Sequence, residues 1–403
     1  MRYPIEWYQM QQLIATHLPN LRPAQQRGLC LWVYGSIKAH SAAQSAVIAA
    51  LLAVAEVRQL LGSAYALRQL LREWCYEGQD RAAPCKTQLD VRACFAPLLR
   101  WLLAWWQTEH LPLALDVTTR RDEITVVCLS VLYRSSAIPI AWHVLPGNKP
   151  AAWIAPLLEL LELLDEQIPP HMQVLLMTDR GLNSAALWQW LREHGWHPLM
   201  RQPNNVTFQP HGGRRKQALL LVGGPGAAWI GQGVAYSEPA KRRNSTLLVV
   251  WGQGQKEPWI LLTDLAPKEV GSAWYGLRVW VELGFRALKG FGWEWQRGRR
   301  TDPERVSRHW LVLAVATLLV VAVGTRSEEA EQLGVAPARL HMPAQLPPMS
   351  RGKRWQSVFR RGLGVLNELL ASRRIWRRLW LRPEPWPDDL PGVHITYHLA
   401  PVS

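Results

Sequence analysis

The segment "LPLALDVT", Leu111–Thr118, begins the change of pattern that decides the fold class. It is a short apolar run that ends on Asp116. The β-rich runs "EITVVCLSVLYR" and "AIPIAWHVLP" follow it, and polar, turn-like segments divide the three runs. Three such runs in quick succession predict three antiparallel strands.

Helices and strands alternate after this meander. A helical pattern covers about Ala151 to Glu166, and the buried-type strand "QVLLMTD" ends on Asp179. The helix "SAALWQWLREHG" and the strand "HPLMRQ" come next. The order β-β-β-α-β-α-β is that of a ribonuclease-H-like α/β domain, in which the first and fourth strands are neighbours. We therefore expect a mixed sheet with Asp116 and Asp179 side by side.

The regions around this core have other patterns. Residues 1–108 repeat apolar side chains at helical spacing and predict an all-helical domain, and residues 109–325 hold the α/β domain. Within the latter, glycine-rich turns and short runs such as "ALLLVG" and "STLLVVWGQG" predict a β-rich insertion at about 204–268. Residues 326–403 are expected to form a proline-containing linker and a basic helical tail to about Leu381.

The composition is that of a folded and strongly basic protein. Hydrophobic residues make up 48% of the 403 residues, which excludes a disordered chain, and the net charge is +15. Arginine-rich clusters lie at 213–216, 240–244, 296–300 and 372–382. One cluster alone indicates a solvated face, whereas four favour a nucleic-acid partner, because the arginine side chain pairs well with phosphate.

Several features predict a cytoplasmic protein. The five cysteines show no C-x-x-C spacing, which is typical of reduced thiols, and the N-terminus lacks the apolar core of a signal peptide. The most apolar segment, Trp310–Gly324, is shorter than the roughly 20 residues that span a bilayer. We expect a buried helix there and no membrane.

The segment "WYGLRVWVELGFRALKG", Trp274–Gly290, sets four polar residues among large apolar ones, in an expected helix that begins at about Ser272. At 100° per residue, one arc of roughly 60° would hold all four. They are Tyr275, Arg278, Glu282 and Lys289. An ordinary salt-bridged helix face would give the same pattern, so this stripe alone assigns no function.

Asp116 and Asp179 change the interpretation of that stripe. Singly, an aspartate at a strand end is more often a turn former or a helix cap. Together with Glu282, the two aspartates form an oxygen-only set of ligands that suits Mg²⁺ or Mn²⁺ and not zinc. A pair of such ions catalyses phosphoryl displacement. Arg278 and Lys289 would then be cations that face the phosphates, with Tyr275 donating a hydrogen bond or stacking nearby.

The spacing Y-x(2)-R-x(3)-E-x(6)-K resembles the signature of DDE transposases of bacterial insertion sequences, the insertion-sequence-four type. "LALDVTTR" and "LLMTDRGL" are similar to the two aspartate motifs of that family, and the likeness covers about residues 110–325. It implies that a dimer bound to terminal inverted repeats nicks 3′ ends and joins them to target DNA. Two Mg²⁺ ions, for which Mn²⁺ can substitute, would be bound by Asp116, Asp179 and Glu282. Tyr275, Arg278 and Lys289 would hold double-stranded DNA near the transposon end.

Three further residues are candidates for DNA contacts. In some members of the family a tryptophan of the insertion stacks on a flipped base, and Trp251 or Trp259 could do so here. Packing inside the insertion would explain either ring as well. Arg180 follows the second aspartate and is expected either to contact phosphate or to form a surface ion pair. DNA-end binding by residues 1–108 rests on the family likeness alone.

Alternatives from other classes remain open. A catalytically silent DNA-binding descendant of a transposase would keep the basic surfaces, but it need not keep all three carboxylates, and none is missing here. A nuclease of the ribonuclease H type would have a similar metal site, but the insertion, the helical N-terminal region and the basic tail favour assembly on duplex DNA. A membrane-associated basic protein fits least well. The expected location is the bacterial cytoplasm, at the nucleoid.

Overall fold

The computed structural model describes residues 3–76, 89–147, 153–337, 340, 356–373 and 378–399. The chain forms two compact units, each built from discontinuous segments. Unit 1 holds residues 1–108, 117–169 and 280–384, and unit 2 holds residues 109–116, 170–279 and 385–403. The three consecutive domains expected from the sequence stay a prediction.

The first part of unit 1 is helical, as predicted. Its described residues form α1 (Ile5–His17), α2 (Pro23–Ala39), α3 (Gln44–Leu52), α4 (Ala55–Leu61), α5 (Ala64–Tyr76), a short 3₁₀ turn (Arg92–Cys94) and α6 (Phe95–Trp105). Helix α2 is buried along most of its length and contacts α1, α3 and α5. Cys30, Cys75, Cys94 and Cys128 are buried, and none of them forms a disulfide in the part of the chain that the structure describes; Cys85 lies outside the described residues.

The remaining elements of unit 1 pack around two antiparallel strands. They are β2 (Ile124–Tyr133), β3 (Ser136–Pro146), α7 (Ile154–Asp165), α9 (Val279–Lys289, whose first residue belongs to unit 2), a 3₁₀ turn (Trp295–Arg297), α10 (Pro303–Gln332) and α11 (Val358–Ala371). Strand β3 contacts α6, α7 and α10. Helix α9 packs against β3 through Gly284, where an added Cβ would lie 2.7 Å from Cβ of Ala137.

Helix α10 is the long buried helix that the sequence predicts. It is long and apolar enough to cross a membrane, but 94% of its most apolar window is buried inside the protein. Helices α3 and α4 would be long and apolar enough to cross a membrane only if they were counted together as one span, and the chain bends by 105° between them. The burial of α10 matches that of a core helix in a folded protein.

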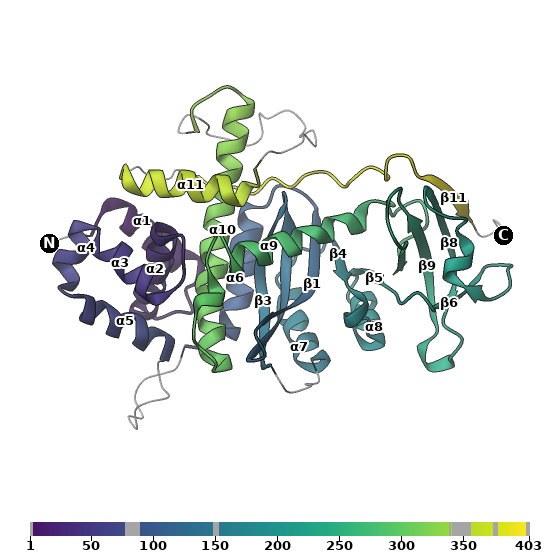
Figure 1. Cartoon of the computed structure of the whole chain (residues 1–403), viewed down its shortest axis with the longest axis horizontal. Coiled ribbons are helices and arrows are strands. Elements are labelled where there is room, and N and C mark those ends of the chain that lie inside the picture. The colour runs from purple at the N-terminus through teal and green to yellow at the C-terminus, as the bar shows by residue number, and fades with distance from the viewer. Residues whose placement is uncertain are drawn as a thin grey trace. The chain divides into compact units, whose positions relative to one another are not determined.

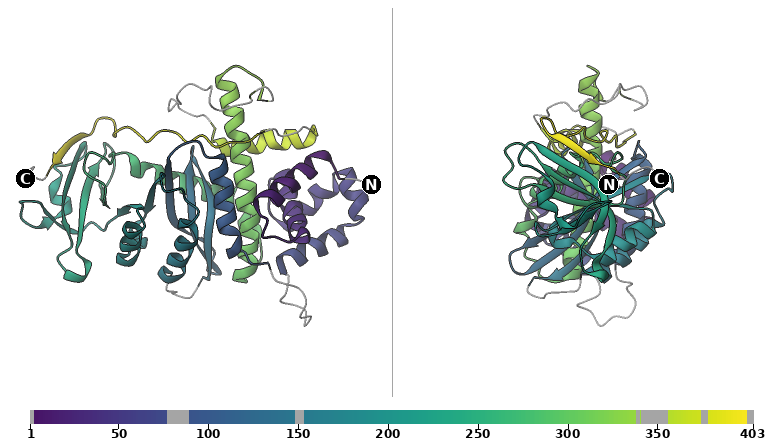
Figure 2. Two further views of the ribbon diagram at one scale, coloured as in Figure 1. Left: turned by 180° about the vertical axis from the view of Figure 1, so that it is seen from behind. Right: turned by 90° about the vertical axis from the view of Figure 1, so that its right-hand side faces the viewer.

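Helix α10 does not end at Gly324, where the sequence predicts its end. It continues to Gln332, and Gly324 lies where a second helix packs closely against it. Helix α11 crosses α10 at this level (Figures 1 and 2), and a Cβ on Gly324 would overlap the carbonyl oxygen of Val358. Gly362 of α11 meets the Val320 carbonyl in the same way. The two glycines let the helix backbones touch.

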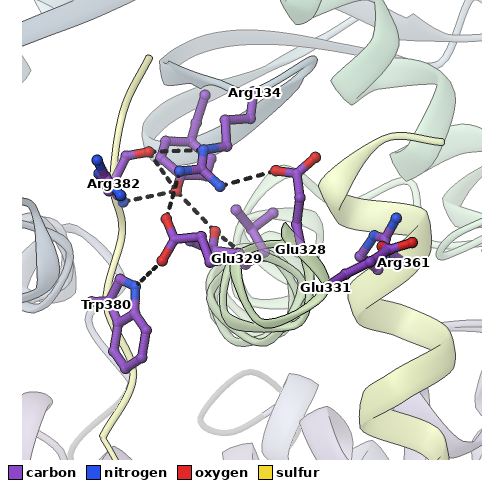
Figure 3. Close-up of polar contacts among 10 residues, drawn as sticks. Arg134, Glu328, Glu329, Glu331, Arg361, Trp380 and Arg382 are labelled. Atoms are coloured by element: carbon purple, nitrogen blue, oxygen red, sulfur yellow. Dashed lines mark hydrogen bonds and ion pairs between the residues drawn. The ribbon is translucent and has the colours of Figure 1, made fainter. Parts of the chain in front are cut away.

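A buried ion cluster joins the turn between β2 and β3 to the last turns of α10 (Figure 3). Nη1 of Arg134 lies 2.9 Å from Oε2 of Glu328, and its Nη2 lies 2.7 Å from Oε1 of Glu329. The Arg134 Nε donates to the carbonyl oxygen of Arg382 at 2.8 Å, and the Trp380 indole donates to Glu329 at 2.7 Å. Burial acts to lower the pKa of Arg134, but its neighbours Tyr133, Glu329 and Glu328 outweigh burial and raise that pKa.

The C-terminal region corrects the prediction of a basic helical tail. The helix α11 ends at Ala371, and residues 378–390 form no helix and, apart from a single bridge at Leu381, no strand. Their conformation depends on contacts with distant residues, since the Leu381 amide donates to the carbonyl oxygen of Trp105 at 2.7 Å. Residues 374–377, the centre of the arginine-rich stretch, lie outside the described residues.

Unit 2 contains one long mixed sheet with the strand order β1-β4-β5-β10-β9-β8-β6-β7, and β11 beside β8. Its elements are β1 (His110–Arg120, of which the residues from Val117 on belong to unit 1), β4 (Gln173–Thr178), α8 (Ala185–Glu193), β5 (His197–Arg201), β6 (Thr207–Pro210), β7 (Lys216–Gln217), β8 (Ala227–Ala235), β9 (Arg243–Trp251), β10 (Trp259–Thr263) and β11 (His394–His398). Three-residue 3₁₀ turns lie at Arg180–Leu182 and Pro239–Lys241, and longer ones at Ala218–Leu221 and Trp274–Arg278. Helix α8 packs on β5.

The predicted β-rich insertion is present, but it extends the main sheet. Strand β10 pairs antiparallel with β5, and β9 and β8 follow it in order. The run "ALLLVG" forms a 3₁₀ turn at Ala218–Leu221, where the sequence predicted a strand. Strand β11, which no sequence pattern predicted, pairs parallel with β8 across a long gap in sequence.

Candidate active site

The two aspartates lie side by side on neighbouring parallel strands, as the sequence predicts. In the β1–β4 register Leu115 is opposite Thr178, so Asp116 and Asp179 each follow the last paired residue of their strands. Five buried residues, Leu111–Leu115, precede Asp116 in β1. The side chain of Asp116 is largely buried, whereas that of Asp179 is 44% exposed. The pair therefore combines one carboxylate that is held within the protein, Asp116, with one that solvent can reach, Asp179.

Asp116 is not at the end of its strand, which corrects the predicted boundary. Strand β1 continues to Arg120, although "VTTR" reads as a turn. Thr118 and Arg120 are buried, and the Arg120 guanidinium donates to the carbonyl oxygen of Gly298 at 2.7 Å and to that of Arg300. These long-range partners keep a polar sequence extended.

Arg278 lies between the two aspartates. Its Nη2 is 2.9 Å from Oδ2 of Asp116 and 3.8 Å from Oδ2 of Asp179, and its side chain is mostly buried. One guanidinium group thus neutralises part of the charge of both carboxylates. The two oxygens converge on a single cationic atom.

Tyr275 contacts the backbone next to the aspartate pair. It lies in the 3₁₀ turn Trp274–Arg278 and is buried, and its hydroxyl donates to the carbonyl oxygen of Thr178 at 3.1 Å. Burial raises the pKa of Tyr275 well above its ordinary value, so the phenol stays protonated and keeps donating. Tyr275 holds the end of β4, one residue before Asp179.

The 3₁₀ turn also corrects the predicted helix, because α9 begins only at Val279. Residues of a 3₁₀ turn advance by 120° each, so the single α-helical stripe calculated from Tyr275 does not form. Glu282, in the first turn of α9, and Lys289, in its last, belong to unit 1. Glu282 is exposed. Burial lowers the pKa of Lys289.

The structure thus brings together Asp116, Asp179, Arg278 and Tyr275 within unit 2. In the part of the chain that the structure describes, no group of three or more histidine, cysteine, aspartate or glutamate residues is arranged to hold a metal ion. Carboxylate oxygens of the aspartate pair are hard donors, of the kind that Mg²⁺ prefers.

Arg180 forms an ion pair, one of the two roles expected for it. Its Nη2 lies 2.6 Å from Oε1 of Glu257, and Nη2 of Arg201 lies 2.8 Å from the same oxygen. Asn204 donates to the other Glu257 oxygen at 3.1 Å. Hydrogen bonds from Arg180 and Asn204 lower the pKa of Glu257.

The two candidate tryptophans are both partly exposed and make local contacts. The indole of Trp251 donates to the carbonyl oxygen of Gln255 at 3.0 Å. The ring of Trp259 packs edge-on against Tyr275, with 5.5 Å between the ring centroids. Trp259 therefore borders the residue that supports the end of β4.

A polar cluster that no sequence pattern predicted holds the loop after Asp179 in place. The side-chain amide of Asn183 donates to Gln202 at 2.5 Å and to the Tyr236 hydroxyl at 2.9 Å. Arg243 donates to the Asn183 side-chain oxygen at 2.9 Å and stacks over the rings of Trp188 and Tyr236. The partners lie far apart in sequence, so no local pattern signals the cluster.

Comparison with known proteins adds family information to this geometry. Residues 136–319, just under half of the chain, match the family model described as transposase DDE domain. The matched segment contains Asp179 and Glu282 and begins after Asp116. No curated protein matches the chain.

Among solved structures, one similar chain is that of a "piggyBac transposase synaptic complex with hairpin DNA", at 10% identity. The match covers 88% of this chain and 84% of that one, with a TM-score of 0.34. A score of this size does not establish a common fold. Over residues 136–319 the chain is thus similar to a transposase DDE domain.

Proposed function

We propose that this protein is a DNA transposase that nicks transposon ends and joins the 3′-hydroxyl to target DNA by metal-dependent phosphoryl transfer. The observation that carries the proposal is the convergence of Asp116 and Asp179 on one cationic atom. The match of residues 136–319 to a transposase DDE domain supports the same reaction class.

The oxygen donors present fit a hard divalent cation. Both aspartates already stabilise a positive charge between them, and the exposed side of Asp179 leaves room for solvent or substrate oxygens. Asp116, Asp179 and Glu282 would hold two Mg²⁺ ions. When bound, these ions would activate the attacking hydroxyl group and stabilise the leaving oxygen.

Other side chains would position DNA beside the carboxylates. Arg278 and Lys289 provide cations for phosphates near the scissile bond, and Arg180 would exchange its Glu257 partner for a phosphate. Tyr275 fixes the strand end under Asp179 and so orients that carboxylate. The net charge of +15 supplies the long-range attraction to duplex DNA.

The proposed oligomeric state follows from the proposed reaction and not from a contact in the structure. Joining two transposon ends to one target calls for two catalytic centres, so we propose a homodimer on paired terminal inverted repeats. The tryptophans of unit 2, Trp251 and Trp259, are proposed as surfaces on which an unpaired base could stack. The cytoplasm, where the nucleoid lies, is the proposed location.

The test is cleavage of a labelled duplex made from the DNA that flanks the coding region, with Mg²⁺ and with EDTA. Nicking should need the metal and should be lost in Asp116→Asn and Glu282→Gln, while DNA binding persists. Glu238→Gln is the matched control, because Glu238 is an exposed carboxylate of unit 2 that pairs only locally with Lys241. This control should nick at the native rate.

Two results would contradict the proposal. Tight DNA binding without cleavage in either condition would favour a silent DNA-binding descendant. Metal-dependent cleavage confined to RNA–DNA hybrids would favour a nuclease of the ribonuclease H type.

A further inference from the structure

The position of Arg278 is unexpected for a residue whose only role is to bind a DNA phosphate. A phosphate-binding arginine normally points its guanidinium to solvent, whereas this one is mostly buried against two carboxylates. Its Nε is also buried, without a hydrogen-bond partner among the described residues. An unsatisfied buried donor costs free energy, so the arrangement is kept by the attraction of the aspartates.

We propose that the Arg278 guanidinium is a built-in cation that occupies the metal position between Asp116 and Asp179 until Mg²⁺ and DNA displace it together. This inference rests on the proposed function, since it takes the aspartates as metal ligands. It adds that metal and DNA each promote the binding of the other.

The argument begins with charge. Arg278 places one positive charge beside two carboxylates, so it reduces the repulsion between the aspartates without a metal. A divalent cation on the same oxygens would lie close to the guanidinium, where the two positive charges repel each other. Metal binding therefore requires Arg278 to leave.

DNA offers Arg278 a second partner. A phosphate accepts the planar guanidinium through two parallel hydrogen bonds, which take the place of its ion pairs with the aspartates. Arg278 is the last residue of the 3₁₀ turn, so its long side chain can move without unfolding α9. Because binding linkage is reciprocal, DNA should tighten metal binding by the same factor as metal tightens DNA binding.

The experiment measures Mn²⁺ binding by the loss of the free-ion electron paramagnetic resonance signal, so it needs no turnover. Without DNA, Arg278→Met should bind Mn²⁺ on the order of tenfold more tightly than the native chain, since the competing cation is gone. A short duplex should tighten Mn²⁺ binding by the native chain and have little such effect on the variant. Arg278→Gln, also neutral, serves if the methionine variant does not fold.

Two controls separate the possible failures. Arg201→Met removes an arginine of unit 2 that pairs with Glu257, so its Mn²⁺ affinity should stay native. Asp116→Asn should weaken Mn²⁺ binding with and without DNA. If it does not, the aspartates are not metal ligands, and both the proposed function and this inference fail. If Asp116→Asn weakens binding but neither neutral Arg278 variant tightens it, only this inference is overturned.

Discussion

Replacing Arg134 with methionine should destabilise the protein strongly. The Arg134 side chain is 0% exposed, and its partners Glu328 and Glu329 are 9% and 0% exposed. Methionine fills a similar space but removes the cation that these two buried carboxylates share. Breaking a buried pair from one side costs about 3 to 5 kcal/mol, so we expect a loss of that size in the free energy of unfolding. The Arg382 carbonyl keeps the Tyr133 hydroxyl as a donor and adds little to the loss.

The matched control is Arg92→Met, an arginine of the same unit that pairs with Glu159 at 2.7 Å. These two side chains are 53% and 59% exposed, so the control should lose only about 0 to 1 kcal/mol. Both losses are measured by urea unfolding followed by circular dichroism. Adding Glu328→Gln and Glu329→Gln to Arg134→Met should recover part of the loss, because the uncompensated charges are removed. Equal losses for Arg134→Met and Arg92→Met would refute the reasoning.

Two other changes test the interior of unit 1. Gly362→Ala should lower the free energy of unfolding in urea by about 1 to 3 kcal/mol, because the added Cβ would overlap the Val320 carbonyl. Gly364→Ala, where the added Cβ meets open space, should instead stabilise α11 by about 0.5 to 1 kcal/mol. A stabilised Gly362→Ala variant would contradict the close helix crossing. Burial, with help from the Arg300 cation, lowers the pKa of His309 well below its ordinary value. Below about pH 6.5 the unfolded chain binds a proton at this histidine and the folded chain does not. The free energy of unfolding should therefore decrease as the pH is lowered, by about 1.4 kcal/mol per pH unit. The His309→Gln variant should lack this contribution to the pH dependence of stability.

The sequence predicted the central strands well, because their patterns are local. Runs of apolar residues that end on Asp116 and Asp179 follow the rules for buried parallel strands, and the topology then makes the two strands neighbours. Gly324 and Arg120 were misread for a common reason. Each has an unusual partner far away in sequence, the α11 backbone for one and the Gly298–Arg300 carbonyls for the other.

The residue types of the candidate site and the pairing of its two aspartates were predictable, but the placement of Arg278 was not. The residue types and spacing of Tyr275, Arg278 and Glu282 indicated a functional segment. The predicted directions of these side chains assumed one ideal α-helix, whereas residues Trp274–Arg278 form a 3₁₀ turn. The placement of Arg278 between the aspartates needs the strand register and the turn together, and neither is visible in a local window.

The discontinuous units have a consequence for how the protein is made. Unit 2 includes residues 385–403, in which β11 pairs with β8 and Asp389 accepts hydrogen bonds from Ser272. Unit 1 needs residues up to 384. Domains usually fold in order as the ribosome releases them. Here unit 1 cannot be completed before residue 384 has been synthesised, and unit 2 cannot be completed before residues 385–403 have been made, so the aspartate pair becomes part of a finished unit only after those late residues are available.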